Sequence, residues 1–254
     1  MPTIGLLGYP ISHSFSKPYF HEKFKRLKLY DFEFKLFEFS QIEDFTSQLK
    51  KEKSLIGFSV TSPHKINILR LLDKIDSAAE AIGAVNCVKV VRNENNSQLI
   101  GYNTDTYGFR QSIKPFLEPH HQPALIIGTG GAARAVEYSL RQIGVDVFFL
   151  TRDKTRFTNS NKYFEYNEIT PEIINHFKLI INTSPAEMTG NSQNFPLLPF
   201  SGISAQHFCY DLIYQPEKTI FLQKCAEQGA MVMNGLDMLY AQAEKAWEIW
   251  NSFT

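Results

Sequence analysis

This sequence has no excess of either charge and no long apolar run. No stretch approaches the roughly 18 consecutive apolar residues of a membrane-spanning helix, which argues against an integral membrane protein. Lys+Arg and Asp+Glu each number 26, so the formal net charge is zero. A nucleic-acid binder usually carries a basic excess, so the balance argues against that class but not against a small anionic ligand in a local cluster.

The cysteines are too few and too scattered for a disulfide framework or a metal site. Cys87, Cys209 and Cys225 are odd in number and far apart, without metal-ligand spacing. They predict a reduced, cytoplasmic protein that binds no metal. The N-terminal segment lacks a basic region and a small-residue cleavage site, so residues 3–7 predict a strand rather than a signal peptide.

Strand and helix patterns alternate along the 254 residues, which predicts an α/β fold with a largely parallel sheet. Strands are expected at residues 3–7, 30–36, 55–61, 85–92, 98–101, 124–127, 145–150, 178–182 and 208–213. Helices are expected to begin at Ser16, near Thr106 and at the glycine loop 128–131, and to span 65–72, 216–227 and 236–250. Two α/β units are therefore expected, with a nucleotide-type domain inserted before a returning C-terminal helix.

A glycine loop at residues 128–133, Gly-Thr-Gly-Gly-Ala-Ala, lies between an apolar strand pattern and a helix pattern, and fits G-x-G-x-x-A. Gly128 permits a tight turn, Gly130 lets the backbone approach a pyrophosphate, and Ala133 keeps helix and strand close. The helix N-terminus favours the anion. The combination predicts dinucleotide binding.

The segment after the next strand bears on the choice between NAD and NADP. About 20 residues after such a loop, an NAD site shows Asp or Glu for the ribose hydroxyls. Here residues 151–156 read TRDKTR. Arg152 and Arg156 can hold a 2′-phosphate through charge-assisted contacts, which favours NADP. Two alternatives stay open: both arginines are solvated surface residues, or Asp153 serves an NAD ribose.

Polar stretches follow strand patterns in the N-terminal part, and such strand ends line the ligand crevice of open α/β sheets. They read GYPISHSFS at 8–16, VTSPHK at 60–65, GAVN at 83–86 and GYNTD at 101–105.

Each candidate in these stretches also has an ordinary structural explanation. Ser14, Ser16, Asn86 and Asp105 are common turn or capping types, and Lys65 is an ordinary solvated lysine when taken alone. His13 and His64 are interpreted as structural because nothing in the sequence orients either ring. No G-x-S-x-G elbow competes for the chemistry.

Together these stretches resemble the shikimate dehydrogenase family over nearly the whole chain. In order, the landmarks are GYPISHSFS, VTSPHK, GAVN, NTDTYGF, GTGGAARA, INTS, YDLIYQP and NGLDMLYAQA. The resemblance implies an N-terminal α/β substrate domain of residues 1–105 and 236–254, with an inserted Rossmann-type NADP-binding domain of residues 106–235. It also implies reversible, NADPH-dependent reduction of 3-dehydroshikimate to shikimate in aromatic amino-acid precursor (chorismate) synthesis, and it leaves a monomer and a homodimer open.

The resemblance implies roles for individual residues, carried over by motif position. Lys65 and Asp105 are the catalytic pair. The substrate is held at its carboxylate by Ser14 and Ser16, at its ring hydroxyls by Thr61, Asn86 and Gln242, and is bordered by Tyr214. The cofactor is held by Gly128, Thr129, Gly130, Gly131, Ala132, Thr151, Arg152 and Arg156, with Leu212 and Gly235 near its nicotinamide end.

These residue types suit the chemistry. A hydride that reaches a carbonyl carbon leaves negative charge on the oxygen, which the Lys65 ammonium can stabilise and protonate while Asp105 orients it. The chain departs from the family pattern at Asp153, where Thr is usual, at Leu212, where Met is common, and at Glu187, where Gly is usual.

Two other functions stay open. One is a quinate/shikimate dehydrogenase that uses NAD or NADP, which quinate turnover would reveal. The other is a non-catalytic dinucleotide-binding regulatory module, which would bind cofactor without turnover.

Overall fold

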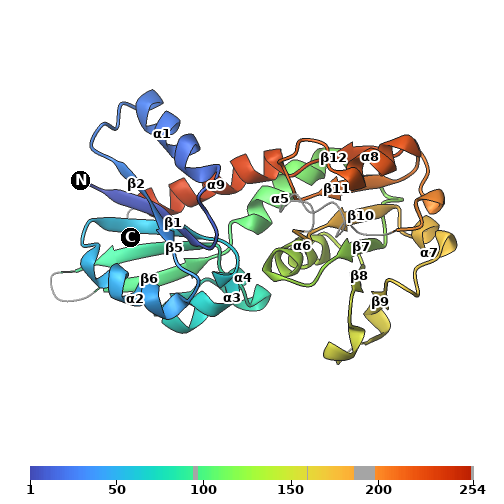
Figure 1. The fold of residues 1–254 in the computed structure, drawn as a ribbon, viewed down its shortest axis with the longest axis horizontal. Helices are drawn as coiled ribbons and strands as arrows, with labels where there is room; N and C mark the ends of the chain where they lie inside the picture. Colours follow the sequence, from blue (N-terminus) through green and yellow to red (C-terminus); the bar gives the residue numbers. More distant parts are fainter. Residues whose placement is uncertain (94–96, 159, 186–197, 253–254) are drawn as a thin grey trace. The chain divides into compact units, whose positions relative to one another are not determined.

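The computed structural model describes residues 1–93, 97–158, 160–185 and 198–252. Glu187 lies outside these residues. Contacts divide the chain into two compact units, Met1–Thr104 with Ala243–Thr254, and Asp105–Gln242. Each unit has its own six-stranded sheet (Figure 1). In the described parts of the chain, no helix is both long and apolar enough to cross a membrane.

The first unit is built on a mixed sheet of order β2-β1-β3-β5-β6-β4. Its strands are β1 (Thr3–Gly8), β2 (Glu33–Glu38), β3 (Leu55–Val60), β4 (Lys74–Ile75), β5 (Cys87–Arg92) and β6 (Ser97–Tyr102). Its helices are α1 (Ser16–Arg26), α2 (Ile42–Lys51), α3 (His64–Asn67), the 3-10 turn η1 (Ile68–Leu71) and α4 (Ser77–Ile82). Because β5 runs antiparallel to both β3 and β6, this sheet is less uniformly parallel than the sequence predicts.

The C-terminal part of α9 (Leu236–Asn251) packs on the first sheet. Gly57 makes room for it, because a Cβ there would lie 2.1 Å from Cδ1 of Trp250. The Trp250 indole donates to the Val88 carbonyl at 3.1 Å, and Lys89 Nζ donates to the Ser252 carbonyl at 2.6 Å. These bonds place the last helical turns on the strands that carry the N-terminal polar loops.

The second unit has a fully parallel sheet of order β12-β11-β10-β7-β8-β9. Its strands are β7 (Ala124–Ile127), β8 (Val147–Thr151), β9 (Tyr163–Glu165), β10 (Leu179–Asn182), β11 (Phe208–Asp211) and β12 (Met231–Met233). The central strands β7, β10 and β11 are buried at every residue, as expected for strands covered on both faces. The order reverses at β7, which makes its carboxyl end a topological switch point.

Helices of the second unit precede, connect and follow these parallel strands. They are α5 (Asp105–Ile113), η2 (Lys114–Phe116), α6 (Gly131–Arg141), η3 (Lys154–Arg156), η4 (Ser160–Lys162), α7 (Pro171–His176), η6 (Phe200–Gly202) and α8 (Ile220–Glu227), followed by the start of α9. Asp105 and residues 236–242 belong to this unit, although the sequence boundaries join them to the first. The reason is close packing: a Cβ on Gly108 would lie 2.5 Å from the Met238 carbonyl oxygen.

The predicted α/β fold class is confirmed, with local differences in its elements. The strand expected at 30–36 is β2 at Glu33–Glu38, and the helix expected at 65–72 divides into α3 and η1. Helix α8 begins only at Ile220 because the Thr219 hydroxyl caps it. Ser16 begins α1, but the capping-type bond is made by Ser14.

Candidate active site

Two polar loops of the first unit meet at one edge of its sheet. Strands β1 and β3 are parallel, so their carboxyl ends lie together, and Thr61 N–H donates to the Leu7 carbonyl at 2.8 Å. Tyr9 N–H donates to the Ser62 carbonyl at 3.0 Å. A Cβ on Gly8 would lie 2.3 Å from Cγ2 of Thr61. The loop with the two serines and the loop with the lysine are therefore neighbours, and glycine permits their close approach.

Ser14 and Ser16 lie in one turn of the backbone at the start of α1. Ser16 N–H donates to Ser14 Oγ at 3.1 Å, and Ser14 N–H donates to the Ile11 carbonyl at 3.0 Å. Both serine side chains are half-buried. The Ser14 hydroxyl accepts in this arrangement, which leaves its own proton to donate to an anion.

The helical turn α3 carries Lys65 directly after a buried histidine. His64 N–H donates to the Thr61 carbonyl at 2.9 Å, and Val85 N–H donates to the Lys65 carbonyl at 2.8 Å. The His64 ring is 1% exposed, and its Nε2 lies 2.6 Å from the Phe39 carbonyl oxygen. A carbonyl oxygen only accepts, so this ring nitrogen carries the proton. The geometry agrees with a structural His64 that anchors the turn on which Lys65 lies.

Asn86 joins the end of the GAVN stretch to the segment before α5. Its amide donates to Thr104 Oγ1 at 3.0 Å, and its Oδ1 accepts the Thr104 N–H at 2.6 Å. Asn103 donates to the Ala84 carbonyl at 2.9 Å. Asn86 is 3% exposed. Asn86 thus positions the residue next to Asp105, a role in addition to the predicted contact with a ring hydroxyl.

Asp105, Tyr214 and Gln242 belong to the second unit. Asp105 is the first residue of α5 and 6% exposed, at the helix end where negative charge is favourable. A Cβ on Gly108 would lie 3.0 Å from the Gln242 Cβ, so α5 and α9 approach closely beside these side chains. Lys65 belongs to the first unit, and its pairing with Asp105 stays a prediction.

The glycine loop has features that suit a pyrophosphate. Gly128 has φ +103°, and a Cβ there would meet Thr183 Oγ1 at 2.8 Å. A Cβ on Gly130 would meet no described atom within 4 Å. Gly130 is the N-cap residue of α6, and no side chain caps that helix end. Open backbone N–H groups at a helix N-terminus suit an anion, so these residues fit a dinucleotide.

The loop after β8 presents two arginines to solvent. Arg152 and Arg156 are exposed, and neither makes an ion pair with any described residue. Thr151 is the last residue of β8, and Asp153 begins the turn η3. The loop lies at the carboxyl end of the strand next to β7, where the adenosine part of a dinucleotide binds in this fold.

A buried polar network at the ends of β10 and β11 was not predicted from the sequence. Asp211 accepts from Asn182 Nδ2 at 3.1 Å, from Ile213 N–H at 3.0 Å and from Thr219 Oγ1 at 2.7 Å. Asn182, Asp211 and Thr219 are all 0% exposed. The one sequence signal was a carboxylate placed directly after the apolar run of β11.

This network holds the two residues expected near the nicotinamide. Leu212 N–H donates to the Asn182 carbonyl at 2.9 Å, and Gly235 N–H donates to the Ile213 carbonyl at 3.1 Å. A Cβ on Gly235 would lie 2.1 Å from the Leu212 carbonyl oxygen. The segment after β11 is therefore fixed from both sides.

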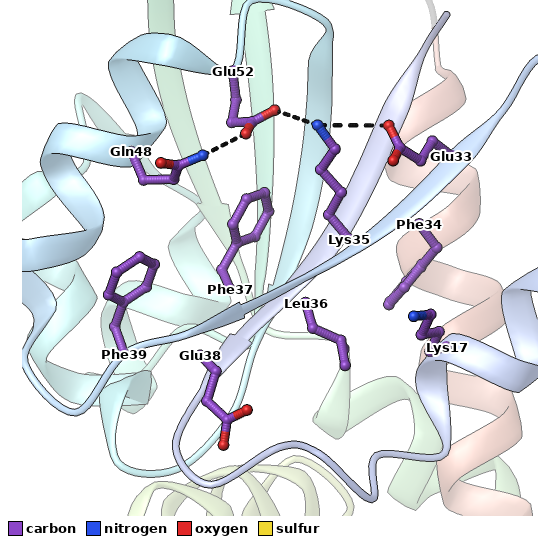
Figure 2. Close-up of a pocket in the computed structure, with 10 residues that line it drawn as sticks. All are labelled: Lys17, Glu33, Phe34, Lys35, Leu36, Phe37, Glu38, Phe39, Gln48 and Glu52. Atoms are coloured by element: carbon purple, nitrogen blue, oxygen red, sulfur yellow. Dashed lines mark hydrogen bonds and ion pairs between the residues drawn. The ribbon is translucent and has the colours of Figure 1, made fainter.

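A cavity of the first unit is lined by none of the predicted site residues. It has a volume of about 610 Å³ and follows strand β2 (Figure 2). Lys35 bridges Glu33 and Glu52 along it, at 3.5 and 2.9 Å. The other lining residues are Lys17, Phe34, Leu36, Phe37, Glu38, Phe39 and Gln48. Among the described residues, no cluster of His, Cys, Asp and Glu has the arrangement of a metal site.

Comparison with known proteins relates both units to one enzyme family. The family described as shikimate dehydrogenase substrate binding domain matches residues 6–88. The chain is 34% identical to the shikimate dehydrogenase (NADP(+)) of Methanococcus maripaludis, over 97% of this chain and 91% of that protein. Among solved structures, shikimate 5-dehydrogenase from Thermus thermophilus in complex with NADP(H) and shikimate is 29% identical, with a TM-score of 0.85 over 100% of this chain and 94% of the other. The enzyme from Listeria monocytogenes in complex with shikimate and NAD is 28% identical, with a TM-score of 0.82 over 98% and 91%.

Proposed function

This chain belongs to the shikimate dehydrogenase family, and on that premise we propose that it catalyses the reversible, NADP-dependent reduction of 3-dehydroshikimate to shikimate. One observation carries the proposal. The same chain combines serine and lysine loops at the strand ends of one unit with an open glycine loop and two unpaired arginines in the other. The reaction belongs to chorismate synthesis, and the lack of a disulfide at Cys87, Cys209 and Cys225, all of them described residues, supports a cytoplasmic location.

Lys65 is the acid and base of the proposed reaction. When bound, NADPH supplies the hydride. The Lys65 ammonium stabilises the negative charge on the carbonyl oxygen and donates the proton that makes the hydroxyl. Asp105 orients that ammonium, and in the reverse direction neutral Lys65 accepts the proton from the hydroxyl.

The substrate ligands follow from residue chemistry. The hydroxyls of Ser14 and Ser16 donate to the substrate carboxylate. Thr61, Asn86 and Gln242 hydrogen-bond the ring hydroxyls, and Tyr214 borders the ring. These side chains both donate and accept, as a polyhydroxylated ring requires, and they add no charge that would compete with the carboxylate.

The cofactor ligands are those of the second unit. The backbone at Gly128, Thr129, Gly130, Gly131 and Ala132 receives the pyrophosphate at the start of α6. Thr151, Arg152 and Arg156 receive the adenosine 2′-phosphate. Leu212 and Gly235 would lie near the nicotinamide.

Absorbance at the reduced-nicotinamide band tests the function. Purified protein would be assayed with shikimate and with quinate, each with NADP and with NAD. Shikimate turnover that depends on NADP supports the proposal. Comparable quinate or NAD turnover would replace it with a dual-specificity quinate/shikimate dehydrogenase. Cofactor binding without turnover of any substrate would replace it with a regulatory module.

A further inference from the structure

One oxygen of the Asp153 carboxylate, Oδ1, is directed at its own loop. This oxygen accepts both the Thr155 N–H, at 3.0 Å, and the Thr155 hydroxyl proton, at 2.6 Å. Asp153 has extended backbone angles, φ −152° and ψ 103°, and is the cap residue of the turn η3. A cap of this kind satisfies N–H groups that the first turn leaves without a partner. The hydrogen bond from Thr155 is also the main reason that the pKa of Asp153 lies below its usual value.

The same loop is held from the neighbouring strand. Lys154 N–H donates to Glu165 Oε1 at 3.0 Å, and Lys154 Nζ pairs with Glu168. Glu165 N–H donates in turn to Glu168 Oε2 at 2.8 Å. The Lys154 charge is therefore balanced by an acid of its own, whereas no described acid forms an ion pair with Arg152 or Arg156, although the Arg156 charge contributes to the lowered pKa of Asp153.

Stacked rings hold the far end of the loop. The Phe157 ring lies 4.1 Å from the Tyr163 ring with 7° between their planes. Tyr163 stacks on Phe149 of β8 at 5.0 Å and 14°. Arg156, the last residue of the capped turn η3, is thus followed directly by a ring that stacks on Tyr163 of β9.

We propose that Asp153 is a positioning residue for NADP: it fixes the turn that carries Arg156 after Arg152, and it does not bind the ribose of NAD. The proposal rests on the proposed function, because it concerns the cofactor of that reaction. It is based on the direction in which the Asp153 side chain points. Asp153 Oδ1 already accepts two hydrogen bonds from Thr155, whereas a ribose-binding carboxylate would accept hydrogen bonds from the two ribose hydroxyls.

Two other roles for the same carboxylate predict opposite effects of its removal. A ribose ligand would make Asp153→Ala lose affinity for NAD and leave NADP binding unchanged or stronger. A purely repulsive neighbour of the 2′-phosphate would make both Asp153→Ala and Asp153→Asn bind NADP more tightly. A cap predicts the reverse for NADP, because the loop loses its preferred arrangement.

The test measures dissociation constants of NADP and NAD by titration calorimetry, alongside kcat and KM for shikimate oxidation. Asp153→Ala is expected to weaken NADP binding about three- to tenfold, the equilibrium change that loss of a cap brings. We expect NAD binding and kcat to change less than about twofold. Asp153→Asn and Asp153→Ser keep an oxygen that can accept from Thr155, and we expect both to stay close to wild type.

Thr155→Val supplies the matched control, because it removes the hydroxyl and keeps the N–H. It is expected to weaken NADP binding less than Asp153→Ala does. The double variant should bind NADP as tightly as Asp153→Ala alone, since Asp153→Ala already removes the acceptor of the Thr155 hydroxyl. Unfolding curves check that each variant folds.

Unchanged or tighter NADP binding by Asp153→Ala, or selective loss of NAD binding, would overturn the inference. Its failure differs from failure of the proposed function. A wild-type protein that binds NADP but oxidises no shikimate refutes the function, and the dissociation constants still decide the role of Asp153.

Discussion

Asn86 and Thr104 bond each other through both halves of the asparagine amide, with Nδ2 donating to Oγ1 at 3.0 Å and Oδ1 accepting the Thr104 N–H at 2.6 Å. They lie 18 residues apart in the chain, and their bond joins two segments of the proposed substrate site. Thr104 precedes Asp105, so the amide that we expect to bind a ring hydroxyl also orders the start of the helix with the proposed catalytic carboxylate.

Replacing Asn86 by Ala should therefore impair both folding and turnover. The change leaves the buried Thr104 N–H without its acceptor, which we expect to lower the free energy of unfolding by about 1–3 kcal/mol. Denaturant unfolding and shikimate turnover would measure the two effects. Thr104→Ser keeps the hydroxyl and the N–H and should behave like wild type. An Asn86→Ala protein with wild-type stability would contradict the importance of this bond.

Lys65→Met should reduce turnover by about 10²–10⁴-fold, because it removes the proposed proton donor and keeps the length of the side chain. NADP binding should stay nearly unchanged, since the proposed cofactor ligands belong to the other unit. Steady-state kinetics and cofactor titration would check both effects. Lys74→Met, at an exposed lysine outside the proposed site, is the control. Near-normal turnover of Lys65→Met would refute the assignment.

Acid should destabilise the second unit through buried histidines. His207 is 1% exposed; its Nδ1 accepts the Ser204 N–H at 3.0 Å, and its Nε2 lies 3.2 Å from the Ile174 carbonyl oxygen. Burial is the main reason that its pKa lies below the usual 6.5, and the same holds for His121. Below pH 6.5 the unfolded chain binds more protons, so the stabilisation by neutral His207 is present above that pH and is lost as the pH falls through the folded pKa.

Urea unfolding between pH 7 and 5 would measure this loss, which is at most about 1.4 kcal/mol per pH unit for one proton. His207→Gln should be less stable at pH 7 and should show a smaller decline toward pH 5 than wild type. His176→Gln, at an exposed histidine, is the matched control. Equal declines in wild type and His207→Gln would exclude His207 as a cause.

Asp211 should be among the most sensitive positions of the second unit. Its replacement by Ala leaves three buried donors unpaired, from Asn182, Ile213 and Thr219, and we expect a loss of about 3 kcal/mol or more. Asp211→Asn keeps the shape of the side chain but places an N–H donor against other donors. Its free energy of unfolding should therefore lie between those of Asp211→Ala and wild type. Thr219→Ser, which keeps the hydroxyl, is the control. Urea unfolding that ranks Asp211→Ala with wild type would contradict the network.

Elements with strong local patterns could be predicted, whereas short ones could not. The strands β7, β10 and β11 are apolar at nearly every position because they are buried on both faces, and the glycine loop follows the first of them. The elements that the sequence pattern did not predict are α2, α4 and α7, and the two- or three-residue strands β4, β9 and β12. Apart from the ten-residue α2, these elements contain too few residues for a periodic pattern, and tertiary packing defines them. Helix α2 buries Ile42 and Phe45 at helical spacing, a signal that the sequence does contain.

The candidate site also has parts that could be predicted from the sequence and parts that could not. The polar loops and the glycine loop could be located because each is continuous in sequence. The Asn182–Asp211 bond spans 29 residues, and it depends on β10 and β11 being neighbours in the sheet. No local pattern contains that adjacency.

The amino-acid sequence alone determined the class of fold, the dinucleotide loop and the set of groups available for chemistry, because these depend on residue type and local spacing. Only the tertiary structure decided how particular polar groups are used. Asp153 could have served a ribose or its own loop, and the structure directs its Oδ1 at Thr155. The physical reason is that hydrogen bonds are short-ranged and directional, so the choice of partner depends on where the backbone places each side chain.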